Sequence, residues 1–132
     1  MKQDQNWLAE MESRRRDDEP SPGQEMAALM RRTDEVLKGL SPEDGAKLRE
    51  LSAGWRELVL AGYALSCGYA PHAADGVGEL LTAAPEGAAW RAENLRLTRA
   101  AEALASTVPE ALPLSDRWDD LCTLALVLGQ RR

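Results

Sequence analysis

Apolar residues recur at steps of three and four along most of the chain, which is the spacing of one face of an α-helix. Proline, glycine and capping residues interrupt this pattern, and the segments between the interruptions have the length of helices. The pattern therefore predicts about six helices. They are a short helix containing Trp7, Leu8 and Met11, followed by residues 24–40, 41–68, 71–82, 85–106 and 115–129. Pro109 and Pro113 mark a loop before the last helix, which Ser115 and Asp116 cap.

The longest predicted helix begins at residues 41–44, whose sequence is Ser-Pro-Glu-Asp. A serine hydroxyl caps free backbone amides, proline fits the first helical position, and acids stabilise the positive end of the helix dipole. Gly68 and Pro71 end this helix, because proline can open the next helix but cannot continue the last one. Between these limits one stripe alternates steps of three and four: Leu48, Leu51, Trp55, Leu58, Gly62, Leu65 and Tyr69.

The N-terminal segment differs from the rest of the chain. Residues 14–19 combine three arginines with three acids, which is typical of a solvated helix end, and residues 20–23 (Pro-Ser-Pro-Gly) stop the first helix. We therefore expect residues 1–23 to form a helical arm with a hinge. We expect residues 24–132 to form a single all-α domain.

The composition supports this fold class. The 132 residues include 21 Ala and 20 Leu but only five Val, five Thr and no Ile or Phe. Good helix formers thus greatly outnumber the β-branched and aromatic residues that strands prefer. A chain of this length also buries enough surface to form a core without disulfides or metals.

The net charge of −6 argues against nucleic acid and anionic membranes as partners, because both are bound through basic surfaces. Residues 58–74 carry no formal charge, but this segment contains Gly62, Gly68 and Pro71 and is short for a bilayer, so we expect no membrane insertion. The first residues contain no apolar stretch of signal-peptide length. These features predict a cytoplasmic protein.

Candidate chemistry is sparse. The single histidine, His72, follows Pro71 at a predicted helix start, where an exposed or capping role is expected. The chain has no glycine-rich phosphate loop and no serine elbow or zinc-protease motif. We expect Cys67 and Cys122 to be buried, reduced thiols rather than a disulfide or a ligand pair, and the aspartates near residue 116 to serve the helix dipole. The sequence thus predicts no enzyme activity, no cofactor and no metal.

One stretch fits a helical repeat. If residue 54 is position 1 of a 34-residue tetratricopeptide repeat, small or apolar residues fall at the consensus positions and Gly68 falls at the turn between the two helices. A second frame that starts at residue 115 ends after half a repeat. The alternative is a small irregular helical bundle, in which small residues match the repeat by chance. The matching residues of the first frame are Leu60, Ala61, Ala64, Ala73, Val77 and Pro85. In the repeat, Ala61, Ala64 and Ala73 would allow the two helices to approach closely.

Residues 67–73 (Cys-Gly-Tyr-Ala-Pro-His-Ala) and 80–86 (Leu-Leu-Thr-Ala-Ala-Pro-Glu) resemble the clear repeat of the small tetratricopeptide-like chaperones of type III secretion systems. Residues 118–122 (Trp-Asp-Asp-Leu-Cys), followed by Gly129, are similar to the later helix of that family. The resemblance implies a cytoplasmic chaperone of a virulence-associated secretion system. Its partner would be a subunit of the secretion apparatus, held until export.

A chaperone of this kind would hold its partner in an apolar groove, where aromatic residues often dominate the binding energy. In the repeat, the stripe of the long helix would face this groove, and Gly62 would leave space for a side chain of the partner. An alternative is that the stripe packs on residues 24–40 and is simply core. A further alternative is a self-associating regulatory or structural protein of phage or toxin-system type, which forms a homodimer through the same stripe. The predicted partner-binding residues are Trp55, Leu58, Gly62, Leu65 and Tyr69.

Overall fold

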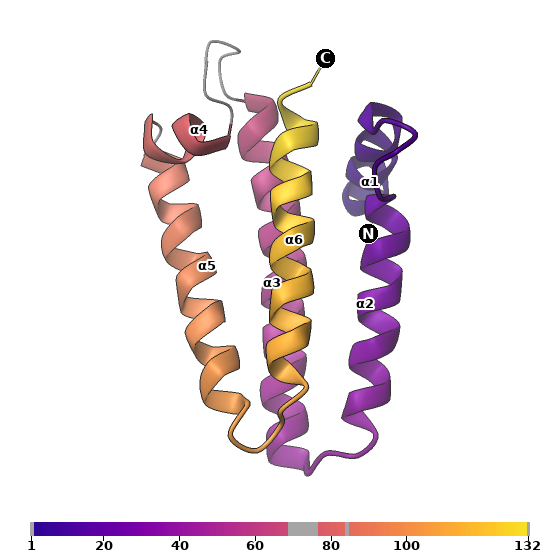
Figure 1. Cartoon of the computed structure of the whole chain (residues 1–132), viewed down its shortest axis with the longest axis vertical. Helices are drawn as coiled ribbons and strands as arrows, with labels where there is room; N and C mark the ends of the chain where they lie inside the picture. Colours follow the sequence, from indigo (N-terminus) through magenta and orange to yellow (C-terminus); the bar gives the residue numbers. More distant parts are fainter. Residues whose placement is uncertain (1, 69–76, 84, 132) are drawn as a thin grey trace.

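The computed structural model describes residues 2–68, 77–83 and 85–131, in which every regular element is a helix and no residue lies in a strand. The prediction of an all-α fold with about six helices is confirmed (Figure 1). The described helices are α1 (Lys2–Arg14), α2 (Pro22–Leu37), α3 (Pro42–Gly68), α4 (Val77–Ala83), α5 (Pro85–Leu104) and α6 (Ala111–Gly129).

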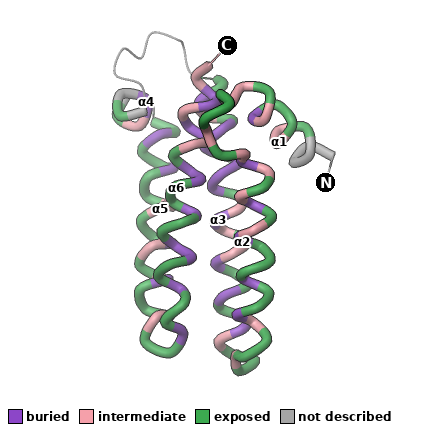
Figure 2. The backbone as a smooth tube through the Cα atoms, turned by 45° about the vertical axis from the view of Figure 1, so that its right-hand side comes forward, coloured by how far each residue is buried: buried purple, intermediate pink, exposed green. Residues whose placement is uncertain are grey.

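The four long helices form a bundle in which α3 and α6 lie at the centre, with α2 and α5 flanking them (Figure 1). Successive long helices run in opposite directions, so α3 and α6 are parallel to each other. Figure 2 shows that the buried positions follow the inner sides of these helices. At one end of the bundle α1 packs on α2, α3 and α6, while α4 packs on α5 and α6.

Serine residues cap two of these helices. The Ser41 hydroxyl accepts a hydrogen bond from the Asp44 backbone N–H at 3.2 Å, as the sequence predicts for the start of α3. The Ser21 hydroxyl accepts one from the Gln24 N–H, also at 3.2 Å, and Pro22 occupies the first turn of α2. The residues that were expected to end the first helix therefore also begin the second.

The centre of the core is an aromatic pair between α3 and α6. The rings of Trp55 and Trp118 are stacked, with centroids 6.2 Å apart and planes inclined by 19°. Trp55 is 2% exposed and Trp118 is fully buried. A pair in this arrangement contributes about 0.5–1.5 kcal/mol beyond the free energy of burying its area.

Near the end of the bundle, α6 comes into backbone contact with α3. A Cβ atom on Gly129 would lie 2.8 Å from the Tyr63 carbonyl oxygen and 2.4 Å from the Cβ of Ser66. The absence of a side chain at Gly129 therefore allows the two helices to approach this closely. A Cβ on Gly87 would likewise lie 2.8 Å from the Leu80 carbonyl oxygen, so α4 rests on the backbone of α5.

The N-terminal helix is attached to the same end of the bundle. Met11 is fully buried in the common core. The Arg14 guanidinium donates a hydrogen bond to the Gly129 carbonyl oxygen at 3.1 Å and lies over the Tyr63 ring, 5.4 Å from its centroid. The Tyr63 hydroxyl donates to a Glu10 carboxylate oxygen at 3.0 Å. The predicted arm thus lies packed on the bundle, whereas a hinge motion about residues 20–23 stays a prediction.

The last helix begins earlier than predicted. Ser115 and Asp116 were expected to cap it, but α6 starts at Ala111 and Ser115 is a buried residue within the helix. Pro113, expected to lie in a loop, occupies the first turn of α6. A proline is tolerated there because the first amides of a helix have no partner within the helix.

Of the two fold alternatives, the structure has the irregular bundle. The repeat frame from residue 54 needs two helices that pack on each other on either side of a turn near Gly68. α3 does end at Gly68, but it begins at Pro42, twelve residues before the frame. Its would-be partner, α4, has seven residues and packs on α5 and α6. Ala61 and Ala64, expected at the contact between paired helices, are exposed. The predicted start of α4 and the repeat position Ala73 lie outside the described residues.

Candidate binding site between α3 and α5

The predicted partner-binding residues are not all placed alike. Trp55 and Leu58 are 2% and 4% exposed, and Trp55 packs within the chain against Trp118. These two residues are therefore core, as the alternative interpretation expects, but Trp55 packs on α6 and not on residues 24–40. Leu65 is half-buried and packs at the edge of the core, while Tyr69 lies outside the described residues. Contact of these five positions with a partner stays a prediction.

Gly62 has a specific packing role against α5. A Cβ at this position would lie 3.0 Å from the indole Nε1 of Trp90. That Nε1 donates a hydrogen bond of 2.9 Å to the backbone carbonyl oxygen of Leu58. Gly62 therefore admits the Trp90 ring against α3, where its polar atom is satisfied. Gly62 leaves space for a side chain, as predicted, but that side chain belongs to this chain.

A second glycine brings α3 and α5 together further along. A Cβ on Gly54 would lie 2.8 Å from a methyl carbon of Leu97. The line of contact between the two helices, which we call the α3–α5 seam, is thus closed at Gly54 and at Gly62. Two pockets open on the outer side of this seam.

The first, which we call the apolar pocket, has a volume of about 550 Å³. Its floor and walls come from the C-terminal half of α3 and the N-terminal half of α5, and two carboxylates stand at its edge. Ala61, Ala64 and Ala89 are exposed, so short side chains form much of its surface. The lining residues are Leu58, Ala61, Ala64, Leu65, Glu86, Ala89, Trp90 and Glu93.

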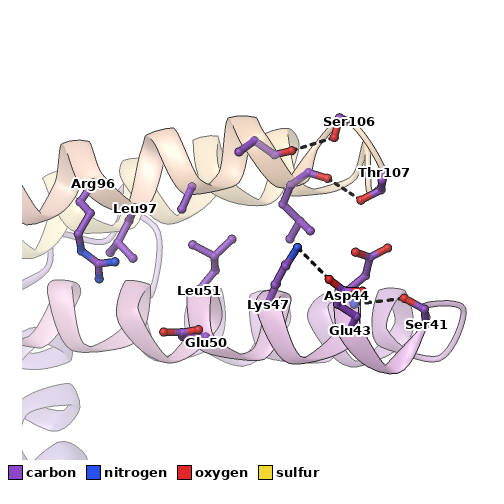
Figure 3. Close-up of a pocket in the computed structure, with 13 residues that line it drawn as sticks. Ser41, Glu43, Asp44, Lys47, Glu50, Leu51, Arg96, Leu97, Ser106 and Thr107 are labelled. Atoms are coloured by element: carbon purple, nitrogen blue, oxygen red, sulfur yellow. Dashed lines mark hydrogen bonds and ion pairs between the residues drawn. The ribbon is translucent and has the colours of Figure 1, made fainter.

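The second, which we call the polar pocket, has a volume of about 570 Å³ and lies between the start of α3 and the end of α5. Figure 3 shows Leu51 of α3 and Leu97 of α5 pointing toward each other between the two helices. The charged side chains at its edge come from both helices. They are Glu43, Asp44, Lys47, Glu50 and Arg96.

The basic residues of the seam are already engaged. Lys47 Nζ lies 3.6 Å from a Glu43 carboxylate oxygen, one turn away on α3. Arg96 pairs with Glu93 through its Nε and Nη2 atoms on α5. The hydrogen bond from Arg96 holds the pKa of Glu93 below its usual value, so this carboxylate is ionised at neutral pH.

Sequence reasoning found part of this site and missed the rest. Leu58 and Leu65 of the predicted stripe do line the apolar pocket. Ala61 and Ala64 were assigned to contacts inside a repeat, and Ala89 was not singled out. The short side chains of these alanines are visible in the sequence. That they line a pocket depends on α5 lying beside α3, which no local sequence pattern predicts.

The two cysteines also differ from each other. Cys122 is buried, as predicted, and burial raises the pKa of its thiol. Cys67 is exposed, which corrects the expectation that both are buried. Cys67 lies on the last turn of α3, where Arg14 Nη1 is 3.3 Å from its Sγ atom.

Within residues 2–68, 77–83 and 85–131 there is no group of three or more His, Cys, Asp or Glu side chains placed to hold a metal ion. In the same part of the chain no helix combines the length and apolar character needed to cross a membrane. Comparisons with protein-family models, with curated proteins and with solved structures each gave no match.

Proposed function

We propose that the protein is a non-catalytic binding protein that holds a helical segment of a partner protein against the α3–α5 seam. The observation that carries this proposal is the presence of two pockets, of about 550 and 570 Å³, on the same seam between the same two helices. Pockets of about 300–1,000 Å³ are typical of sites that hold small ligands, so each of these two pockets has room for large side chains of a partner. The pockets between α2 and α3 and between α2 and α6 have smaller volumes, of about 340 and 190 Å³.

The shape of the seam favours a helix as the bound segment. Two antiparallel helices leave a groove between them, and a third helix packs by placing its side-chain ridge into that groove. Exposed alanines on both sides, such as Ala61 and Ala89, keep the groove walls low. Large partner side chains can then reach Leu58 and Leu65 in the apolar pocket.

The identity of the partner is proposed from the sequence resemblance. A small, acidic, helical protein that binds a helical segment fits a cytoplasmic chaperone of a type III secretion subunit. Residues 69–73 and 84 of the resembling segments lie outside the described residues, and the described residues of α4 pack on α5 and α6. The general proposal, that the protein binds a helix, therefore does not depend on the partner being a secretion subunit.

A self-associating regulatory protein is the alternative proposal. It would use the Trp55 stripe for a homodimer, but Trp55 and Leu58 are buried within the chain. A dimer through this stripe would require that α3 and α6 first separate.

The test is to fill the apolar pocket and compare it with a matched change outside it. Ala89→Phe places a ring in the pocket, whereas Ala92→Phe places the same ring on an exposed position of α5 that does not line it. Each tagged variant is purified from its native cells, and retained proteins are identified by mass spectrometry with light scattering on the eluted complex.

We expect a stoichiometric partner with the unmodified protein and with Ala92→Phe, and its loss with Ala89→Phe. Circular dichroism of each purified variant checks that the helices are intact. Retention of the partner by all three proteins would reject the seam as the binding site. A bare homodimer from cells that express the neighbouring genes would favour the alternative.

A further inference from the structure

Building on the proposed function, we infer that the segment bound at the α3–α5 seam is a basic amphipathic helix, with an apolar face for the pockets and Lys or Arg side chains for the acids beside them. The inference specifies the chemistry of the partner. It follows from the charges at the seam and from their spacing along the two helices.

The acids flank an apolar floor. The apolar pocket contains two carboxylates, those of Glu86 and Glu93, and no basic side chain lines it. The polar pocket contains three carboxylates and two basic side chains, and both basic side chains are paired with glutamates of their own helix. Within the described part of the chain, Asp44, Glu50 and Glu86 form no ion pair of this kind, and Glu50 interacts with Arg96 only at longer range. With five carboxylates against two basic side chains, the seam presents an excess of negative charge.

The spacing of these acids matches a helix lying along the seam. Glu86 and Glu93 are seven residues apart on α5, and Glu43 and Glu50 are seven residues apart on α3. Seven residues are two helical turns, or about 10.5 Å, so each pair stands on one face of its helix. A partner helix that runs along the groove presents its own side chains at the same interval. Basic residues repeated every seven positions on both sides of its apolar face would therefore meet the acids.

Two of these acids serve the charge test best. Glu43, Asp44 and Glu86 lie in the first turns of α3 and α5, where acids also stabilise the helix dipole. Glu50 and Glu93 lie within their helices and are more than one turn from either start. Reversing the charge of these two residues changes the seam while leaving the helix starts as they are.

The experiment measures the binding of two synthetic helical peptides, each about 20 residues long so that it spans about 30 Å of the seam. They share one Leu/Ala face and differ in the flanking residues, which are Lys in one peptide and Glu in the other. Binding to the full-length protein is followed by fluorescence anisotropy. The Kd is measured at about 50 mM and about 300 mM salt, since screening grows strongly over this range.

We expect the Lys peptide to bind about tenfold more tightly than the Glu peptide at low salt, and to lose most of that advantage at high salt. The double variant Glu50→Lys/Glu93→Lys should weaken the Lys peptide about tenfold. The matched control is Glu35→Lys/Glu102→Lys, which changes the net charge equally at exposed positions of α2 and α5 that line neither pocket. In the control the affinity should stay within about twofold of the unmodified protein. Ala89→Phe should weaken binding and Ala92→Phe should not.

The inference would be overturned if the two peptides bound equally tightly or if neither peptide bound. An equal loss in the seam variant and in the control would also overturn it, because the attraction would then come from the overall charge. The proposed function has a separate readout. If Ala89→Phe removes the native partner while the Lys peptide shows no preference for the seam, a partner is bound there but its segment is not a basic helix.

Discussion

Replacing Trp55 with alanine tests whether the central stripe of α3 is core or binding surface. The indole is 2% exposed and stacks on Trp118 at 6.2 Å. Truncation of a buried tryptophan costs about 3–5 kcal/mol, through lost burial and the cavity that remains. Because single domains have a free energy of unfolding of about 5–15 kcal/mol, this change removes a large part of the stability.

The assay is urea denaturation followed by far-UV circular dichroism. With a denaturant slope of about 1–3 kcal/mol per molar urea, the midpoint should fall by about 1 M or more. If Trp55→Ala does not fold at all, Trp55→Phe keeps a ring in the stack and should cost about 0.5–3 kcal/mol, which can be measured. The control is Leu95→Ala, at a side chain that is 50% exposed, and it should change the stability by less than about 0.5 kcal/mol. A loss below about 1 kcal/mol for Trp55→Ala together with loss of partner binding would refute the core assignment.

Three further predictions concern the packing of α6, the ion pair between Glu19 and Arg131, and the two thiols. Gly129→Ala should lower the free energy of unfolding by about 1–3 kcal/mol in the same assay, because its Cβ would lie 2.8 Å from a carbonyl oxygen of α3. The control is Gly68→Ala, whose Cβ would meet no neighbouring atom of the described residues within 4 Å and which should leave the stability unchanged. Equal effects of the two variants would contradict the packing of α6 on α3. The hydrogen bonds from Arg131 lower the pKa of Glu19 from 4.5 to about 2, so the pair stabilises the fold above pH 4.5 and this stability is lost as the pH falls toward 2. Thermal unfolding should therefore show a deficit for Glu19→Gln at pH 6 that shrinks by pH 3, and a deficit independent of pH would argue against the pair. Ellman's reagent should react with one thiol, that of Cys67, in the folded protein and with two thiols after unfolding. Cys67→Ser should remove the thiol that reacts in the folded protein. Reaction of two thiols in the folded protein would show that Cys122 is accessible.

The start of α3 and the fold class were predictable because their causes are local. Ser41 and Pro42 place a cap and a first-turn proline within four residues of each other, and the structure shows the expected hydrogen bond from Asp44. The start of α6 was not predictable in this way. Glu110, at the position before it, makes no side-chain capping bond, whereas the serine that looked like a cap is buried inside the helix.

Local sequence also could not show which of the small residues are buried and which are exposed. Gly62 and Ala61 are neighbours on α3, yet Gly62 is buried under Trp90 and Ala61 is exposed in the apolar pocket. Ala61 fits the repeat consensus and Gly62 belongs to the apolar stripe, and both patterns depend only on residue size and spacing within this stretch of the chain. The difference between them arises from α5, whose tryptophan reaches Gly62 from 28 positions further along the chain.

Local patterns determined that this chain is helical, roughly where its helices lie, and which stripe of α3 is most apolar, because caps, prolines and helical periodicity act over a few residues. Tertiary structure decided which part of that apolar surface is core and which part is exposed. Trp118 and Gly129 bring α6 onto α3 and bury Trp55, while α5 leaves the alanines beside Leu65 uncovered. These contacts join residues far apart in sequence, so they depend on shape complementarity between whole helices and not on the pattern within any one of them.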